Sequence, residues 1–206
     1  MIDLQLRARL LGLLASGEHV DRRSAEDAIS WIRRCETPYR LRKPDVPNTH
    51  LAAYAIIRAD DTFLLVDHAR ARSWIPVGGH LEPGELPAEA IAREVREELG
   101  VDPKAVSRTP FFVTRTKVTD GQVEHTDVTF WHIVDVERAA VGERTVDGHE
   151  KLRWFGIDEI RDLRDIVGLR RAIAAMERSD LRLRCRSAPK LGDPRQGDLN
   201  LHVMAE

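Results

Sequence analysis

The sequence predicts an α/β fold preceded by a helical hairpin, and three observations carry this prediction. Helical patterns come first in the chain, one rich in leucine at residues 3–16 and one with Ile29, Trp31 and Ile32 at residues 24–35. From residue 51 the pattern changes to short runs of β-branched and aromatic residues bounded by turn signals, which are typical of strands. Residues 88–99 then show the spacing of an amphipathic helix that packs one face onto a sheet.

The two N-terminal helices are expected to form a hairpin. Ser24 is placed to cap the second helix, and the proline-rich residues 37–47 mark a linker after it. The apolar faces of the two helices exceed what two short helices can bury against each other. We therefore expect the hairpin to dock on the rest of the chain and on a second copy in a homodimer.

The remaining elements follow from strand and turn signals. A turn at 59–61 joins the first two strands, and Asp120-Gly121 joins two longer ones. A helix is expected from Asp158 and another to about Arg178, followed by an irregular tail over 180–206. The expected strands are 51–58, 62–67, 74–77, 110–118, 123–136 and 151–155.

The segment from Gly79 to Val101 is the most informative part of the chain. It holds a glycine, then Glu85 six residues on, and then the run Arg93-Glu94-Val95-Arg96-Glu97-Glu98-Leu99-Gly100-Val101. This spacing resembles the Nudix box of the Nudix hydrolases at every fixed position. The resemblance extends over residues 48–165, and it implies an α/β/α sandwich with a mixed β-sheet between helices.

The chemistry of this segment explains its spacing. On a helix, Glu94 lies three and four residues before Glu97 and Glu98, so the three carboxylates share one face. Two carboxylates about 4 Å apart repel each other by on the order of 4 kcal/mol at an effective dielectric near 20, so a cation between them is favoured. Mg²⁺ fits best, with Mn²⁺ as a substitute, because both are hard ions that prefer oxygen ligands.

The resemblance assigns the other residues of the box to this ion. It implies metal ligands at the Gly79 carbonyl and at Glu94, Glu97 and Glu98, and an ion pair between Arg93 and Glu85 that holds the loop 80–86 against the helix. Gly100 supplies the left-handed residue that ends the helix. The division of the chain that follows is a hairpin and linker over 1–47, a hydrolase domain over 48–165, and a C-terminal helix with an irregular tail over 166–206.

Several residues outside the metal site are candidates for chemistry or substrate contact. The general base is open between Glu94, Glu98 and Glu150, because members of the family take a further acidic group from a later loop. An exposed acidic residue in a loop, with no catalytic role, is an equally good interpretation of Glu150. The candidate substrate contacts, each with a structural alternative as a core or surface residue, are Trp74, Arg115, His125 and Asp127.

The resemblance implies a Mg²⁺-dependent pyrophosphohydrolase that cleaves a nucleoside diphosphate linked to a group X, or a nucleoside triphosphate. Markers of particular substrates are missing, since Thr116 stands where ADP-ribose hydrolases often carry proline. The residues Lys117-Val118 lack the tyrosine associated with dinucleoside polyphosphate hydrolases. The alternative is a non-enzymatic module for ligand sensing or protein interaction that retains the metal site.

Composition and charge argue against several other classes of protein. A net charge of −2 gives no basic excess for a nucleic acid polymer, and no apolar run is long enough to cross a membrane. The N-terminus lacks a signal-peptide pattern, and Cys35 and Cys185 are too far apart in sequence for a zinc motif. We therefore expect a cytoplasmic protein, and the resemblance implies a small-molecule nucleotide as its partner. The dominance of arginine over lysine, together with abundant alanine, indicates a G+C-rich bacterial genome.

Overall fold

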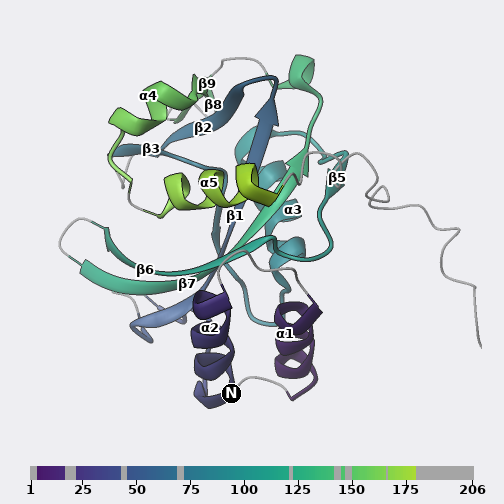
Figure 1. The fold of residues 1–206 in the computed structure, drawn as a ribbon, viewed down its shortest axis with the longest axis vertical. Coiled ribbons are helices and arrows are strands. Elements are labelled where there is room, and N and C mark those ends of the chain that lie inside the picture. Colours follow the sequence, from purple (N-terminus) through teal and green to yellow (C-terminus); the bar gives the residue numbers. More distant parts are fainter. Residues whose placement is uncertain are drawn as a thin grey trace, which may run out of the picture.

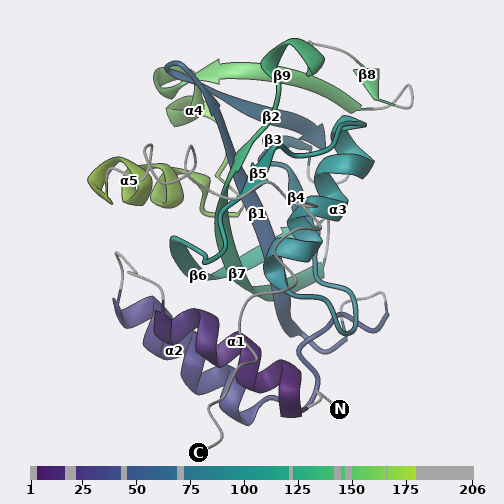
Figure 2. The same ribbon diagram turned by 90° about the vertical axis from the view of Figure 1, so that its right-hand side faces the viewer.

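The computed structural model describes residues 4–16, 22–42, 46–68, 72–120, 123–141, 145–146, 150–165 and 167–179. Within these ranges the chain forms one mixed sheet with helices on both faces, as Figures 1 and 2 show from two directions. The predicted α/β/α fold with a preceding helical hairpin is confirmed. The expected turn at Gly121, the loop 147–149 and the tail 180–206 lie outside the described residues.

Strand β1 (Thr49–Ala59) is the centre of the sheet. It pairs in parallel with β7 (Val123–Asp135) and antiparallel with β2 (Thr62–His68) and β4 (Gly78–His80). Both faces of β1 are buried, which fits its nearly continuous apolar sequence. The other strands extend the sheet from these neighbours: β3 (Ser73–Ile75), β5 (Ala105–Val106), β6 (Phe112–Asp120), β8 (Thr145–Val146) and β9 (Glu150–Gly156).

The two faces of the sheet carry separate apolar cores. Helix α3 (Pro87–Leu99) covers one face together with the N-terminal helices α1 (Leu4–Ser16) and α2 (Arg22–Arg34). Helices α4 (Ile157–Asp162) and α5 (Leu169–Ser179) cover the other. No helix in the described parts of the chain is both long and apolar enough to span a membrane.

The N-terminal hairpin packs on the rest of the same chain, which confirms one half of its expected docking. Leu10, Leu14 and Ile32 are fully buried in the core that also contains Leu51 and Leu81. Polar contacts add to this packing: Asp27 of α2 accepts a hydrogen bond from Arg115 of β6 at 3.3 Å. Pro38, beyond α2, accepts a backbone hydrogen bond from Leu51 of β1 at 2.7 Å.

The structure contains short elements that the sequence patterns do not predict. Strands β4, β5 and β8 have two or three residues each, and β4 contains both Gly78 and Gly79. Such short strands form because a longer neighbouring strand pairs with them through its backbone, as β1 does with β4. Their own residues carry no alternation to detect. A one-turn 3₁₀ helix at Arg138–Ala140 was likewise not expected.

We predict that Leu10→Ala lowers the free energy of unfolding by about 2–5 kcal/mol, because it leaves a cavity in the shared core. Leu4→Ala is the matched control: Leu4 lies on the same helix with 78% of its surface exposed, and its truncation should change stability by less than about 0.5 kcal/mol. Urea unfolding followed by tryptophan fluorescence measures both. Equal small effects would show that the hairpin unfolds independently of the sheet.

A second prediction concerns pH and His132 of β7. This side chain is fully buried, and its Nδ1–H donates to the Ser107 carbonyl at 2.8 Å. Burial lowers the pKa of His132 from 6.5 to about 4, although the hydrogen bond opposes the shift. The folded state therefore binds fewer protons than the unfolded state, and this contribution to stability is complete above pH 6.5 and is lost as the pH falls toward 4.

His132→Asn removes the titration while its side-chain amide can still donate to Ser107. Between pH 6.5 and 4.5 the wild type should lose on the order of 2 kcal/mol more unfolding free energy than the variant. Urea titrations at both pH values measure this difference in slope. The same slope in both proteins would contradict a neutral, buried His132.

Candidate active site

Helix α3 presents an apolar face to the sheet and an acidic face to a cleft. Ile91, Val95 and Leu99 are completely buried, as their spacing predicts. The helix begins at Pro87, and the Glu89 carboxylate accepts a hydrogen bond from the Leu86 backbone N–H at 2.8 Å. Gly100 ends the helix in the left-handed conformation with a φ of 65°.

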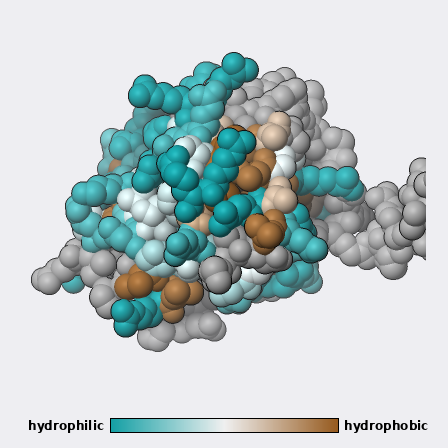
Figure 3. Space-filling model, turned by 90° about the horizontal axis from the view of Figure 1, so that it is seen from below, coloured by the Kyte–Doolittle hydropathy of each residue, from teal (hydrophilic) through white to brown (hydrophobic). Residues whose placement is uncertain are grey.

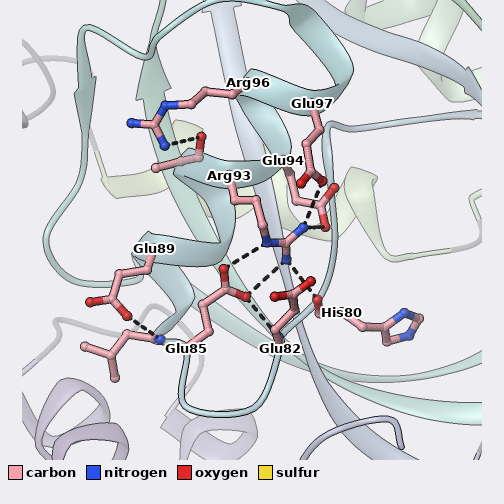
Figure 4. A network of polar contacts seen from close by, with 10 residues as sticks. His80, Glu82, Glu85, Glu89, Arg93, Glu94, Arg96 and Glu97 are labelled. Atoms are coloured by element: carbon pink, nitrogen blue, oxygen red, sulfur yellow. Dashed lines mark hydrogen bonds and ion pairs between the residues drawn. The ribbon is translucent and has the colours of Figure 1, made fainter. Parts of the chain in front are cut away.

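Arg93 is the centre of the polar network in front of this helix (Figure 4). Its Nε and Nη2 atoms donate to the two carboxylate oxygens of Glu85 at 2.9 and 3.1 Å. Nη1 donates to Glu94 at 2.8 Å and to Glu97 at 3.0 Å, and Nη2 also donates to the His80 carbonyl at 3.3 Å. The expected pair with Glu85 is therefore present, and its bidentate geometry raises the pKa of Arg93.

Gly78 and Gly79 let strand β4 pass close to the acidic helix face. A Cβ on Gly79 would lie 2.7 Å from Glu94 Oε1, and a Cβ on Gly78 would lie 2.2 Å from the Ala53 carbonyl oxygen. Gly78 also has a φ of 142°, which side chains disfavour. Its backbone N–H donates to Glu98 at 3.4 Å. The two glycines thus bring main-chain atoms next to Glu94 and Glu98.

The carboxylates of Glu94 and Glu98 face a cleft of about 370 Å³. Burial raises the pKa of Glu94, although the neighbouring Arg93 opposes this shift. The lining of the cleft comes from loops and strands as well as from α3, and the structure adds two residues that the sequence patterns did not single out, Arg40 and Tyr54. Burial also raises the pKa of the Tyr54 hydroxyl well above its usual range, and nearby acids add to the shift.

The wall opposite the acidic face carries histidines and one aspartate on three adjacent strands. In the sheet register His50 of β1 is opposite Asp127 of β7, and His80 of β4 is opposite Ala52 of β1. Residues two apart share a face of a strand, so His50, His80, His125 and Asp127 all project to the same side. Burial would raise the pKa of Asp127, but the three surrounding imidazoles lower it well below its usual range.

The expected substrate contacts divide into two groups. His125 and Asp127 line the cleft. Trp74 does not: its ring packs edge-on against Phe155 with centroids 4.9 Å apart, because β3 turns it toward the α4 and α5 side. Arg115 is also absent from the cleft lining and contacts Asp27 of α2 instead.

Two of the expected acidic residues are placed differently from Glu94 and Glu98. Glu97 is 58% exposed, bonds to Arg93, and is not part of the cleft lining. Glu150 begins β9, and its side chain lies outside the described residues. His50 was missed because a histidine inside an apolar strand gives no signal until the register of the sheet is known.

Comparisons with known proteins agree with this geometry. Residues 48–176 match the family model for the NUDIX domain. The chain is 31% identical over 108 residues to bis(5'-nucleosyl)-tetraphosphatase (asymmetrical) of Sus scrofa, covering 50% of this chain and 72% of the relative. It is 28% identical over 109 residues to CTP pyrophosphohydrolase of Escherichia coli, covering 51% and 74%.

Among solved structures, a NUDIX-family hydrolase from Clostridium perfringens is similar with a TM-score of 0.47 and 22% identity, over 64% of this chain and 97% of that one. The chain belongs to the Nudix hydrolase family, whose members act on phosphoric anhydride bonds. The predicted family is therefore confirmed, and the matched region extends into α5.

The contacts of Glu85 generate a prediction. Glu85 holds Arg93 and also accepts a hydrogen bond from the Glu82 backbone N–H at 2.9 Å, so it positions the loop without facing the cleft. Glu85→Gln keeps one acceptor and should lower kcat by about 10-fold, less than a change at Glu98. Faster amide hydrogen exchange over 80–86 should accompany the loss. A loss of kcat equal to that of Glu98→Gln would give Glu85 a direct chemical role.

Proposed function

We propose that the protein is a Mg²⁺-dependent pyrophosphohydrolase that cleaves a nucleoside diphosphate linked to a group X, or a nucleoside triphosphate. The observation that carries this proposal is the convergence of Glu94, Glu98 and the Gly79 backbone on one cleft. The bis(5'-nucleosyl)-tetraphosphatase and the CTP pyrophosphohydrolase are both named for reactions on nucleotide phosphates. That shared class supports a nucleotide substrate.

The residues present fit a hard divalent cation. All donors are oxygens, and Gly79 leaves open the space beside Glu94 that a side chain would fill. We propose Glu94, Glu98 and the Gly79 carbonyl as ligands, with Glu97 joining from the rim of the helix. When bound, Mg²⁺ would neutralise the diphosphate and increase the acidity of a coordinated water.

The protein's own residues orient the substrate and handle the proton. Arg40 lines the cleft and supplies positive charge for a phosphate group. Arg93 engages Glu94 directly, which leaves Glu98 as our proposal for the group that takes the proton from the attacking water. Glu94 and Glu150 are the alternatives. Arg93 and Glu85 act as positioning residues, because their contacts are with each other and with neighbouring protein groups rather than with the substrate.

A screen of nucleotides tests the proposal. Nucleoside triphosphates, dinucleoside polyphosphates and nucleoside diphosphate sugars are incubated with the full chain and Mg²⁺, and the products are separated by ion-exchange chromatography. A nucleoside monophosphate with pyrophosphate or with a phosphorylated group X is the expected product pair. No turnover of any member of the panel with Mg²⁺ or Mn²⁺ would favour the alternative of a binding module.

We predict that Glu98→Gln lowers kcat by on the order of 10² or more while the fold is retained, because a ligand and a proton acceptor are lost together. Glu89→Gln is the matched control: it removes one charge from the same helix, and glutamine can still accept the hydrogen bond from Leu86. Steady-state kinetics and circular dichroism measure both variants. Undiminished wild-type turnover in excess EDTA would also contradict the assignment.

We also propose a cytoplasmic homodimer. The buried leucines of the hairpin are already used within the chain, so support comes from the exposed Leu41. Figure 3 shows the end of the molecule that carries the hairpin as a largely hydrophilic surface with separate hydrophobic patches. Light scattering coupled to size exclusion measures the mass, and Leu41→Ser should shift a dimer toward the monomer. A monomeric wild type would overturn this assignment.

A further inference from the structure

We propose that His50, His80, His125 and Asp127 form a second metal site, suited to a borderline divalent transition-metal ion such as Zn²⁺. The site is distinct in chemistry from the oxygen ligands on α3. It lies on the opposite wall of the same cleft, and it stands whether or not the acidic site hydrolyses nucleotides.

The four ligand atoms already converge. Asp127 Oδ1 lies 3.2 Å from His50 Nε2, 3.3 Å from His80 Nε2 and 3.3 Å from His125 Nε2. One potential ligand atom from each of the four residues falls within 4.8 Å of all the others. Four ligands bonded to Zn²⁺ at 2.0–2.1 Å in a tetrahedron stand about 3.3 Å apart. The three separations from Asp127 Oδ1 match this spacing, and the separations between the imidazole nitrogens are at most 4.8 Å.

Hydrogen bonding alone explains the arrangement less well. A carboxylate oxygen has two lone pairs, yet three imidazole nitrogens surround Oδ1. Charge-assisted N–H···O bonds are also shorter, at about 2.7–2.9 Å. The separations of the three imidazoles from Asp127 therefore fit ligands around an ion better than direct hydrogen bonds.

The hydrogen bond of His50 to the backbone gives independent support. His50 Nδ1 lies 2.9 Å from the Pro47 carbonyl oxygen, which can only accept, so Nδ1 carries the hydrogen. His50 Nε2 then faces the Asp127 carboxylate, 3.2 Å from Oδ1. An N–H donated to a backbone carbonyl by the far nitrogen is the usual arrangement of a histidine that ligates a metal.

The sheet and the cleft provide rigidity and access. The ligands lie on three adjacent strands, β7, β1 and β4, so their backbone positions are fixed by the register. His50, His125 and Asp127 are almost completely buried, whereas the His80 side chain is 18% exposed. His80, His125 and Asp127 line the cleft, which gives an ion a path of entry. Three imidazoles favour Zn²⁺, Co²⁺ or Ni²⁺ over Mg²⁺.

Co²⁺ is the probe for the experiment, because imidazole ligands in a tetrahedral site give it intense visible absorption. The full chain, free of tag histidines and stripped of metal, is placed in excess Mg²⁺ to occupy the oxygen ligands and is then titrated with Co²⁺. We expect one equivalent to produce the tetrahedral spectrum and one equivalent of Zn²⁺ to abolish it. Histidine ¹⁵N spectra of the wild type with Zn²⁺ should show shifts at His50, His80 and His125.

Variants assign the spectrum to the cluster. His80→Ala should weaken Co²⁺ binding by on the order of 100-fold or more, and its partial exposure makes it the safer change for folding. His50→Ala tests a buried ligand, with circular dichroism to confirm the fold. His132→Asn, which removes another buried histidine from β7, and Glu98→Gln should both keep the wild-type spectrum.

Two results would overturn the proposal. One is a wild type that gives neither the tetrahedral spectrum nor histidine shifts at millimolar Co²⁺ or Zn²⁺. The other is wild-type Co²⁺ affinity in a folded His80→Ala variant. Loss of nucleotide hydrolysis is not a readout here, so failure of this proposal and failure of the proposed function are distinguishable.

Discussion

The guanidinium of Arg93 is the contact on which the candidate site depends. This one group engages the carboxylates of Glu85, Glu94 and Glu97 and the carbonyl of His80. Without a cation at this point, the acidic residues of α3 and its loop would repel one another in a partly buried setting. Arg93 therefore lets the loop, strand β4 and the acidic helix face come together, and it does so with a planar fork that lysine could not replace.

Strand β1 supplies the complementary constraint from the other side of the cleft. It pairs with β4 next to the acidic helix and with β7 next to the aspartate, so one strand sets the spacing of both walls. The two walls carry different metal-donor atoms: one offers oxygen atoms, which are hard donors, and the other offers mainly imidazole nitrogens, which are softer. Through its backbone carbonyl His80 contacts Arg93, and through its ring it contacts Asp127. A shift of β4 would thus disturb both sets of proposed ligands.

The local parts of this site could be predicted from sequence, and the parts that depend on strand register could not. The spacing of Glu94, Glu97 and Glu98 already fixes one helical face, because 3.6 residues per turn is a property of the helix itself. His50 comes next to Asp127 only after β1 pairs in parallel with β7, a contact between residues 77 positions apart in the numbering. The position of Trp74 outside the cleft has the same origin, because the face of the sheet that it joins depends on β3 pairing with β2.

The N-terminal hairpin joins these constraints, although it precedes the matched family region at residue 48. Its leucines pack into the core beneath α3, and its polar face reaches β6 through Asp27 and Arg115. The chain then passes Pro38, whose carbonyl is bonded to β1, and two residues later Arg40 lines the cleft. Docking of the hairpin therefore fixes the backbone position of Arg40. If Arg40 binds a phosphate group as proposed, loosening the hairpin should weaken phosphate binding before it disturbs the proposed metal ligands, because those are held by Arg93 and β1.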